Sequence, residues 1–352
     1  MHWINWIILG IAVVLTGAGG LAILYQLFNG LNRTGLNDRY VWGLNIQGFF
    51  TLSSYAAGIL TIISAWILMG LPDPGGIFAP AGTLAFGFLI SSQILLGSDL
   101  GRPLRALYIL KGRNFISPLT WDFVTLMILT LCSFLLMFNL VPQNVFFIKV
   151  WALVTLLTSL LCIVVHTIFF IPKVEAGYNS HPFSSLDIFS GSIWSGAAVM
   201  VLMSTGLDLQ KTFLGFLLVF SIIVFASSAG AFIASKLGRT EHKNIKFLVI
   251  NGVIILGLVA ENLVLKEGLF AGPIIAVLVL FAVFIEKYDL VTEYQGKPSL
   301  PLPYSMFEKI TPYKPSIIEL GSLVASFSLS VVIFYAVYIF KLYILPFVLS
   351  WF

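Results

Sequence analysis

Charged side chains are scarce in this sequence. Only 10% of its 352 residues are Asp, Glu, Lys or Arg, whereas soluble globular domains carry about 25%. Hydrophobic residues make up 59% and aromatic residues 14%, and the mean hydropathy is +1.01. No stretch is polar enough for a soluble domain, and we expect no nucleic-acid partner. The chain is therefore predicted to be an all-α integral membrane protein.

Cysteine and histidine are equally rare. The two cysteines, Cys132 and Cys162, both lie in apolar segments, so neither a disulfide framework nor a thiolate metal cluster is expected. A b-type heme would need paired axial ligands such as two facing histidines. Only His166 lies well inside an apolar stretch, and the other histidines lie at segment ends or in connections: His2, His181 and His242. We expect no heme and no metal in this chain.

Long apolar runs dominate what remains. A spanning helix needs roughly 20 apolar residues, and ten runs qualify: 3–28, 43–70, 77–97, 117–140, 146–171, 188–207, 212–235, 246–265, 268–286 and 317–347. The longest break between them is 287–316. The first run lacks a basic n-region and a small-residue cleavage site, so we expect a retained helix and not a signal peptide. The sequence thus predicts about ten transmembrane helices in a single polytopic membrane domain, 1–352.

The basic residues are distributed unevenly between the two faces that ten alternating spans would create. Of 19 Lys and Arg residues, four fall on one face: Lys149, Lys211, Lys266 and Lys341. By the positive-inside rule the face with the remaining bases is cytoplasmic and both termini are outside. The sequence pI of about 9.0 then reports topology first. Alternatively, some of these bases contact a partner subunit and do not report insertion.

Small residues recur at helical spacing in three places. These are Ser54-x-x-x-Gly58, Ser192-x-x-x-Gly196 and the run Thr16–Gly20. Small residues allow helix backbones to approach closely in lipid. The pattern predicts packed helices and carries no chemistry.

Four short motifs carry a family resemblance. They are WGLNIQGFFTLSSYAAG (42–58), DLGRP (99–103), SPLTWDF (117–123) and YKPSIIE (313–319). With their order and spacing, the chain resembles the NrfD/PsrC-like family, the quinone-interacting membrane subunits of polysulfide reductase-like complexes. The last motif resembles the ten-helix branch that includes hydrogenase and alternative complex III membrane subunits.

The resemblance implies a fold and a set of partners. The fold has two four-helix bundles, helices 2–5 (about 43–171) and helices 6–9 (about 188–286), with helix 1 (about 3–28) and helix 10 (about 317–347) peripheral. An iron–sulfur subunit would dock on the face with Asp99, Arg102 and Arg105, and would connect to a molybdopterin or NiFe catalytic subunit. Many family members place this face outside the cytoplasmic membrane, which opposes the charge count, so the orientation stays open.

The resemblance also points to a quinone site. In relatives a tyrosine near the end of helix 5 holds a quinone carbonyl, and His166 occupies that place here. Imidazole can donate a hydrogen bond and titrates near neutral pH. Asn45 and Gln47 are further candidate donors, while Trp42 and Phe49 would pack on the quinone ring. A structural histidine, and capping roles for the polar side chains of helix 2, are the alternatives.

Two acidic positions complete the candidate residues. Asp122 follows Pro118 by one helical turn, so it could relay protons to the quinone or pair with Arg102 or Arg105. Glu261, with Asn262, is the deepest acidic site toward the other face. It could form one end of a proton path, or pair with Lys266.

These observations favour a quinone-binding anchor in the cytoplasmic membrane. It would relay electrons between the iron–sulfur subunit and a menaquinone- or ubiquinone-type pool, with or without proton movement. A scaffold without a quinone site and a secondary transporter are the alternatives. Transporters tend to have Gly- or Pro-broken helices at the midplane, and here only Pro80 and Pro273 lie away from segment ends. The partner subunit would choose the terminal substrate.

Overall fold

The computed structural model describes most of the chain: residues 3–37, 40–100, 108, 115–142, 144–170, 182–207, 209–237, 245–264, 271–296 and 313–344. Within these ranges the long elements are all α-helices, and their bounds are α1 Trp3–Asn29, α2 Leu44–Leu68, α3 Phe78–Asp99, α5 Pro118–Met137, α6 Val145–Phe169, α7 Pro182–Met203, α8 Gln210–Lys236, α9 Ile245–Val264, α10 Ala271–Gly296 and α11 Ile317–Ile339. A π-helical turn, Phe340–Ile344, follows α11.

Most of these helices have the length and composition of membrane spans. Eight of them, namely α1, α2, α3, α5, α6, α7, α8 and α11, are long and apolar enough to cross a bilayer. The other two, α9 and α10, have 20 and 26 residues. The predicted class, an all-α integral membrane protein, is confirmed.

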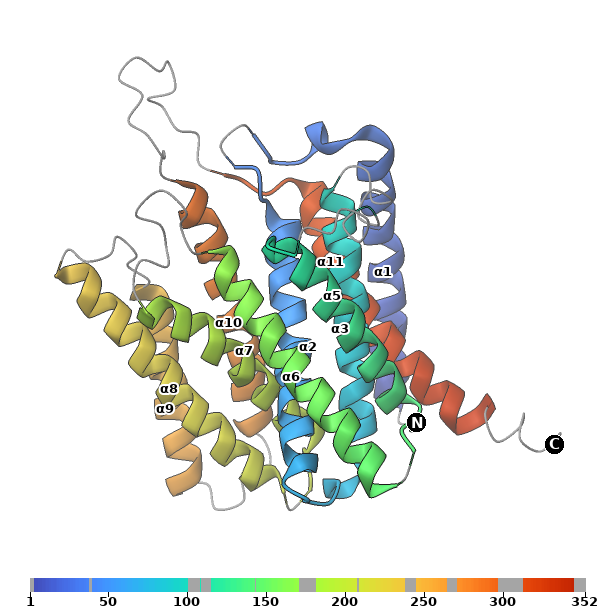
Figure 1. Cartoon of the computed structure of the whole chain (residues 1–352). Helices are drawn as coiled ribbons and strands as arrows, with labels where there is room; N and C mark the ends of the chain where they lie inside the picture. The colour runs from blue at the N-terminus through green and yellow to red at the C-terminus, as the bar shows by residue number, and fades with distance from the viewer. Residues whose placement is uncertain are drawn as a thin grey trace, which may run out of the picture.

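The helices form two bundles that lie side by side (Figure 1). In the first, α2, α3, α5 and α6 pack around one another, and in the second α7, α8, α9 and α10 do so. The main contact between the bundles is α2 against α7. Outside them, α1 packs along α11, and α11 packs on α3. The expected architecture of two bundles with peripheral first and last helices is present.

Capping signals in the sequence explain where several helices begin. Pro118 follows Ser117 at the first position of α5, where proline costs nothing because that N–H has no helical partner. At α6 the Asn144 side chain accepts a hydrogen bond from the Phe146 N–H at 2.8 Å. Ser316 and Glu319 form a reciprocal capping box at the start of α11. These caps set the register of the side chains that form the site described below.

The end of α10 differs from the prediction. The apolar pattern ends at residue 286, and 287–316 is expected to be a connection. In the structure α10 continues to Gly296, and Lys287, which the topology count places in a loop, is buried inside the helix. Its ammonium lies 3.5 Å from a carboxylate oxygen of the neighbouring Glu286. The prediction is wrong here because the opposite charge at the next position lets the helix continue inside the protein.

Small residues make the closest helix contacts. A Cβ placed on Gly58 of α2 would collide with the Ser192 carbonyl oxygen of α7, and a Cβ on Gly196 would collide with the Gly58 backbone. The two predicted small-residue motifs therefore pack against each other and join the bundles. The third motif acts similarly, since a Cβ on Gly19 would collide with the Gly321 carbonyl of α11.

Replacing Gly196 with alanine should therefore destabilise the protein. The methyl group would meet backbone atoms that cannot rotate away, and such overpacking typically costs about 1 to 3 kcal/mol. Gly215→Ala in α8 is the matched control, because nothing lies within 4 Å of its Cβ position and alanine favours a helix by about 1 kcal/mol over glycine. Thermal unfolding in detergent should show a lower midpoint for Gly196→Ala only. Equal midpoints would contradict this account of the bundle contact.

Candidate functional site

A buried histidine–aspartate pair lies in the first bundle. Asp122 is in the second turn of α5, and His166 is in the last turn of α6. The two helices are antiparallel, so the start of one meets the end of the other. The His166 Nε2 atom lies 3.1 Å from Asp122 Oδ1, and each side chain is 1% exposed. Two candidate residues separated by 44 positions are thus hydrogen-bonded to each other.

The pair orients the imidazole and leaves its second nitrogen available. Since the Asp122 carboxylate accepts at Nε2, that nitrogen carries the proton. Among the residues that the structure describes, the buried Nδ1 atom has no hydrogen-bond partner. Buried polar atoms without a partner are rare and call for a physical reason. Here the unpaired nitrogen is the most reactive group of the pair.

Aromatic rings enclose the imidazole. The Phe49 and Phe50 rings of α2 meet it edge-on, with centroids 5.9 Å and 5.2 Å away. Phe50 also packs against Phe169 and Phe170 at the end of α6. Trp42 lies in the next layer, at 6.5 Å from Phe50. Trp42 and Phe49 were predicted from the sequence, whereas Phe50 was missed although it is adjacent in the same motif.

Cys162 adds a third potential ligand. It precedes His166 by one helical turn, and its Sγ atom lies 3.8 Å from His166 Nε2. The donor atoms of Asp122, Cys162 and His166 lie within 4.8 Å of one another, a spacing compatible with one metal ion. The 3.1 Å separation of Nε2 and Oδ1 is also an ordinary hydrogen-bond length. A carboxylate–imidazole hydrogen bond therefore accounts for the arrangement without a metal.

Asn45 lies on a different side of α2. Its amide donates to Gln26 Oε1 of α1 at 3.2 Å, and the Gln26 amide donates to the Ser98 carbonyl of α3 at 3.0 Å. Asp99, at the end of α3, lies beside Asn45. Asn45 thus connects α1, α2 and the predicted docking residue Asp99. The other two predicted docking residues, Arg102 and Arg105, lie outside the described residues.

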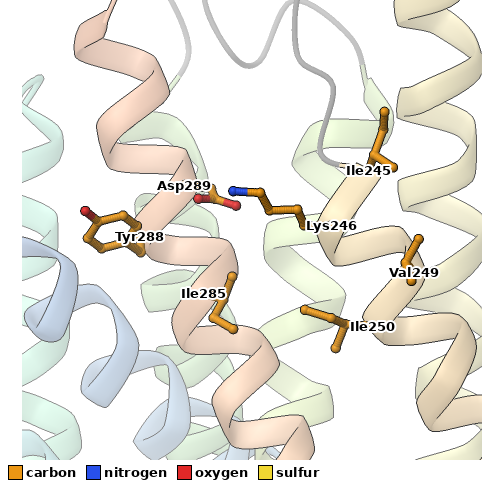
Figure 2. A pocket seen from close by; sticks show the side chains of 7 residues that line it. All are labelled: Ile245, Lys246, Val249, Ile250, Ile285, Tyr288 and Asp289. Carbon is orange, nitrogen blue, oxygen red and sulfur yellow. The ribbon is translucent and has the colours of Figure 1, made fainter. Parts of the chain in front are cut away.

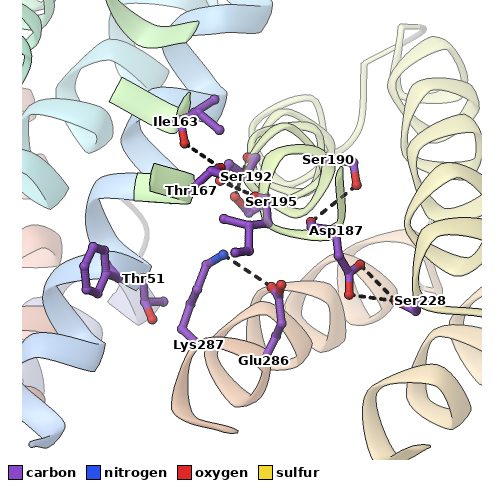
Figure 3. Close-up of polar contacts among 12 residues, drawn as sticks. Thr51, Ile163, Thr167, Asp187, Ser190, Ser192, Ser195, Ser228, Glu286 and Lys287 are labelled. Atoms are coloured by element: carbon purple, nitrogen blue, oxygen red, sulfur yellow. Dashed lines mark hydrogen bonds and ion pairs between the residues drawn. The ribbon is translucent and has the colours of Figure 1, made fainter. Parts of the chain in front are cut away.

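Gln47 is fully buried in α2. Neither atom of its side-chain amide has a hydrogen-bond partner among the side chains and backbone groups that the structure describes. Thr51, one turn further along α2, lies opposite Lys287 of α10 (Figure 3). Because residues four apart share a helix face, Gln47 is on the face of α2 that looks toward the second bundle. The structure thus separates the three polar candidates of helix 2 and helix 5 into distinct surroundings.

Glu261 lies away from the histidine, in the last turn of α9. It is buried, and its carboxylate lies against the start of α10, where a Cβ on Gly272 would approach it to 3.2 Å. The same Cβ would lie 3.3 Å from the Gln210 amide at the start of α8. The side chain of Asn262 and the whole of Lys266 are outside the described residues. A role for Glu261 in proton transfer remains a prediction.

A groove lies on the second bundle, between α9 and α10 (Figure 2). Its volume is about 690 Å³, and its walls are mainly apolar. Lys246, Tyr288 and Asp289 are its polar residues, and the Lys246 ammonium points toward Asp289. The predicted site residues do not line this groove.

A known protein matches part of the chain. No family model matches it, but 121 residues are 35% identical to a "Putative dimethyl sulfoxide reductase membrane subunit" of Halobacterium salinarum. This chain is related to an oxidoreductase membrane subunit. The matched region is 34% of this chain and 28% of the relative, so the chain spans well under half of that protein's length. The resemblance predicted from the four motifs, to a family of oxidoreductase membrane subunits, agrees with this match.

This related chain also holds a polar cluster that sequence analysis missed. Asp187, Glu286 and Lys287 are buried where α7, α8 and α10 meet. Asp187 was missed because the apolar run was drawn from residue 188, whereas α7 begins at Pro182. The signal for Glu286 and Lys287 is the apolar sequence that resumes after them at Leu290 and Val291, both fully buried.

Proposed function

We propose that this chain is the quinone-binding membrane subunit of an oxidoreductase complex. It would relay electrons between a docked iron–sulfur subunit and the quinone pool, and the catalytic subunit beyond would carry molybdopterin or NiFe. The relationship to a reductase membrane subunit supports the assembly. The observation that carries the quinone site is the buried imidazole of His166, with one nitrogen held by Asp122 and the other unpartnered within the described chain.

The surroundings of His166 suit a quinone headgroup. Small-molecule sites are mostly apolar with a few placed polar groups, and this one offers aromatic walls from Phe49 and Phe50 beside a single imidazole. Trp42 edges on Phe50 and Phe170 and closes the outer side of the aromatic cluster. A planar quinone ring can pack among such rings while its carbonyl oxygen meets Nδ1.

The pair can also supply a proton. Reduction of a quinone to a quinol takes up two electrons and two protons. The ionised Asp122 carboxylate stabilises a positively charged imidazolium, in which Nδ1–H donates to the quinone oxygen. As negative charge develops on that oxygen, the proton moves across from Nδ1, and His166 is left neutral with Nε2–H still on Asp122. Two protein groups thus perform one of the two proton transfers without moving.

The docking face follows from the same geometry. The starts of α2 and α5 and the ends of α3 and α6 lie at one end of the first bundle. Asp99 is at the end of α3, next to Asn45. An iron–sulfur subunit bound over this end would place its cluster on the side of the bundle that holds His166.

The helices offer no support for transport by broken spans. Pro80 and Pro273 are both in the first turn of their helices, α3 and α10. Proline is tolerated there because the first-turn N–H groups have no helical partner. Neither proline interrupts a described helix at its middle, which is where transporters of that kind hold their substrate.

Purification of the tagged chain from its native membrane tests the proposal. An iron–sulfur subunit and a molybdopterin or NiFe subunit should copurify, and the complex should react with a short-chain quinone. Metal analysis after removal of the partners should find no stoichiometric iron or other metal, and absorption spectra should show no heme Soret band. A chain that purifies alone, or a complex that reacts with dyes but never with quinones, would refute it.

A further inference from the structure

The second bundle contains a buried carboxylate whose oxygens are held by two neighbouring serines. Asp187 of α7 receives the Ser228 hydroxyl at 2.9 Å on Oδ1 and 3.0 Å on Oδ2, and the Ser227 hydroxyl lies 3.1 Å from Oδ1. Both serines come from α8, and Asp187 is 2% exposed. Figure 3 shows this contact between α7 and α8.

A second carboxylate and a lysine approach from α10. Glu286 and Lys287 are 0% and 1% exposed, and Nζ lies 3.5 Å from Glu286 Oε2. Gly191, one turn after Asp187 in α7, admits this carboxylate, since a Cβ there would come within 3.2 Å of Oε2. Asp187 is close enough to interact electrostatically with both Glu286 and Lys287. We call these three residues the second-bundle cluster.

Lys287 is directed into this cluster without completing its hydrogen bonds. Its ammonium has three donors, yet Nζ has no hydrogen-bond partner in the described part of the chain. Across from it, Thr51 of α2 uses its hydroxyl on its own helix, donating to the Gln47 carbonyl at 2.8 Å. A fully buried ammonium with spare donors marks a place where a polar exchange partner is accommodated.

The charges of the cluster do not balance. Two ionised carboxylates and one ammonium leave one net negative charge, and isolated charge inside a membrane protein is costly. The other ionisable groups nearby do not compensate. Tyr55 faces Glu286 from α2 but donates its hydroxyl to the Leu280 carbonyl, and Asp289 points toward Lys246 in the groove of Figure 2. One added proton makes the cluster neutral.

We propose that Asp187, Glu286 and Lys287 form a buried proton-binding site that takes up and releases one proton. The proton resides on one carboxylate while the other pairs with Lys287, and it passes between the two carboxylates as the pairing changes. A proton fits better than a metal cation, because Lys287 already supplies a cation to the same carboxylates. The proposal does not depend on the quinone site.

The location gives the site a route toward the docking end. The Trp42 N–H donates to Gln295 Oε1 at 2.7 Å, and the Gln295 amide donates back to the Trp42 carbonyl at 2.8 Å. This contact pairs the start of α2 with the end of α10. Lys287 is eight residues before Gln295, or about 12 Å along the helix at ~1.5 Å per residue. The buried Gln47 amide lies on the α2 face along this stretch and can bond a passing water molecule.

Infrared spectroscopy of the full chain in lipid nanodiscs tests the proposal. A protonated carboxyl group has a C=O stretching band that shifts in D2O, and one such band should belong to the cluster near neutral pH. Asp187→Asn and Glu286→Gln should each abolish it, because the remaining carboxylate then pairs with Lys287 and needs no proton. Lys287→Met should instead increase it, since both carboxyls must then be neutral. Asp73→Asn, on the connection before α3, is the control that should leave the band unchanged.

Two results would overturn the proposal. One is a carboxyl band that persists unchanged in both Asp187→Asn and Glu286→Gln. The other is a band that disappears when sodium is added at constant pH, which would assign the site to a monovalent cation. If either variant fails to fold, Ser228→Ala decides the matter, because loss of a hydroxyl bonded to Asp187 must move the frequency of the band if Asp187 carries the proton.

Discussion

The His166→Phe variant is expected to lower quinone-linked turnover of the assembled complex by roughly 100-fold or more, the usual contribution of a positioned proton donor. Phenylalanine keeps the ring that Phe49 and Phe50 contact but removes both nitrogens. Activity of the catalytic partner with a soluble dye should be unchanged, because that route bypasses the membrane subunit. The two assays, performed on one preparation, separate loss of the quinone site from loss of the partner.

Two further variants sharpen this test. His166→Tyr places the residue that the family resemblance implies at this position and restores a donor, so it should recover part of the lost turnover. Asp122→Asn keeps the shape of the pair but removes the charge that stabilises an imidazolium, so it should slow turnover less than His166→Phe. Quinone turnover within a factor of two of wild type in His166→Phe would show that the histidine is structural.

Glu319→Ala is expected to be the most destabilising single change in the chain. The Glu319 carboxylate is fully buried and accepts four hydrogen bonds. Oε2 receives the backbone N–H groups of Gly35 and Ser316 at 2.7 Å and 2.9 Å, and Oε1 receives the Tyr313 hydroxyl at 2.6 Å and the Leu44 N–H at 3.3 Å. Each buried donor left without a partner costs about 1 to 3 kcal/mol, so we expect a loss of at least ~4 kcal/mol.

Tyr313 keeps its proton in this network. Burial raises the pKa of the Tyr313 phenol above its ordinary value, and its hydrogen bond to the Glu319 carboxylate raises it further. The phenol is therefore a donor at every pH at which the protein is studied. It also accepts the Leu44 N–H at 2.7 Å, so the carboxylate and the phenol together hold the first turn of α2.

Ile317→Ala is the matched control for Glu319→Ala. It lies in the same turn of α11 but is 86% exposed, so its loss should change stability little. Thermal unfolding in detergent, with the fraction of chain assembled into the complex as a second readout, compares the two variants. Similar midpoints for both would show that the Glu319 network does not stabilise the fold.

Most helix positions could be predicted from the sequence because the signal is physical and local. Runs of about 20 apolar residues have few alternatives in a chain with so little charge. The prediction failed where charges are paired within a helix, at Glu286 and Lys287, because hydropathy counts each charge as exposed. Only tertiary contact shows that these two side chains and Asp187 are buried together.

The candidate site was predictable in part. The pairing of Asp122 with His166 follows from antiparallel α5 and α6, although the sequence left Asp122 equally free to pair with arginine. Asn45 could not be placed, because its partner Gln26 is in α1, a helix whose position no local pattern reveals. Phe50 shows a different limit, since both Phe49 and Phe50 contact His166 although only one was expected to face it.

The pairing of the first helix with the last has a consequence for biosynthesis. Gly19 of α1 meets Gly321 of α11, and the Glu319 carboxylate binds the N–H groups of Gly35 and Leu44. Some 300 residues separate these contacts, and at about 5 to 20 residues per second a ribosome needs roughly 15 to 60 s to cover that distance. During this interval α1 is already made and has no partner, and the start of α2 has unfilled hydrogen bonds. The nascent chain must therefore be held by lipid or by the insertion machinery until its last span emerges, and a chain stopped before α11 is a natural target for membrane quality control.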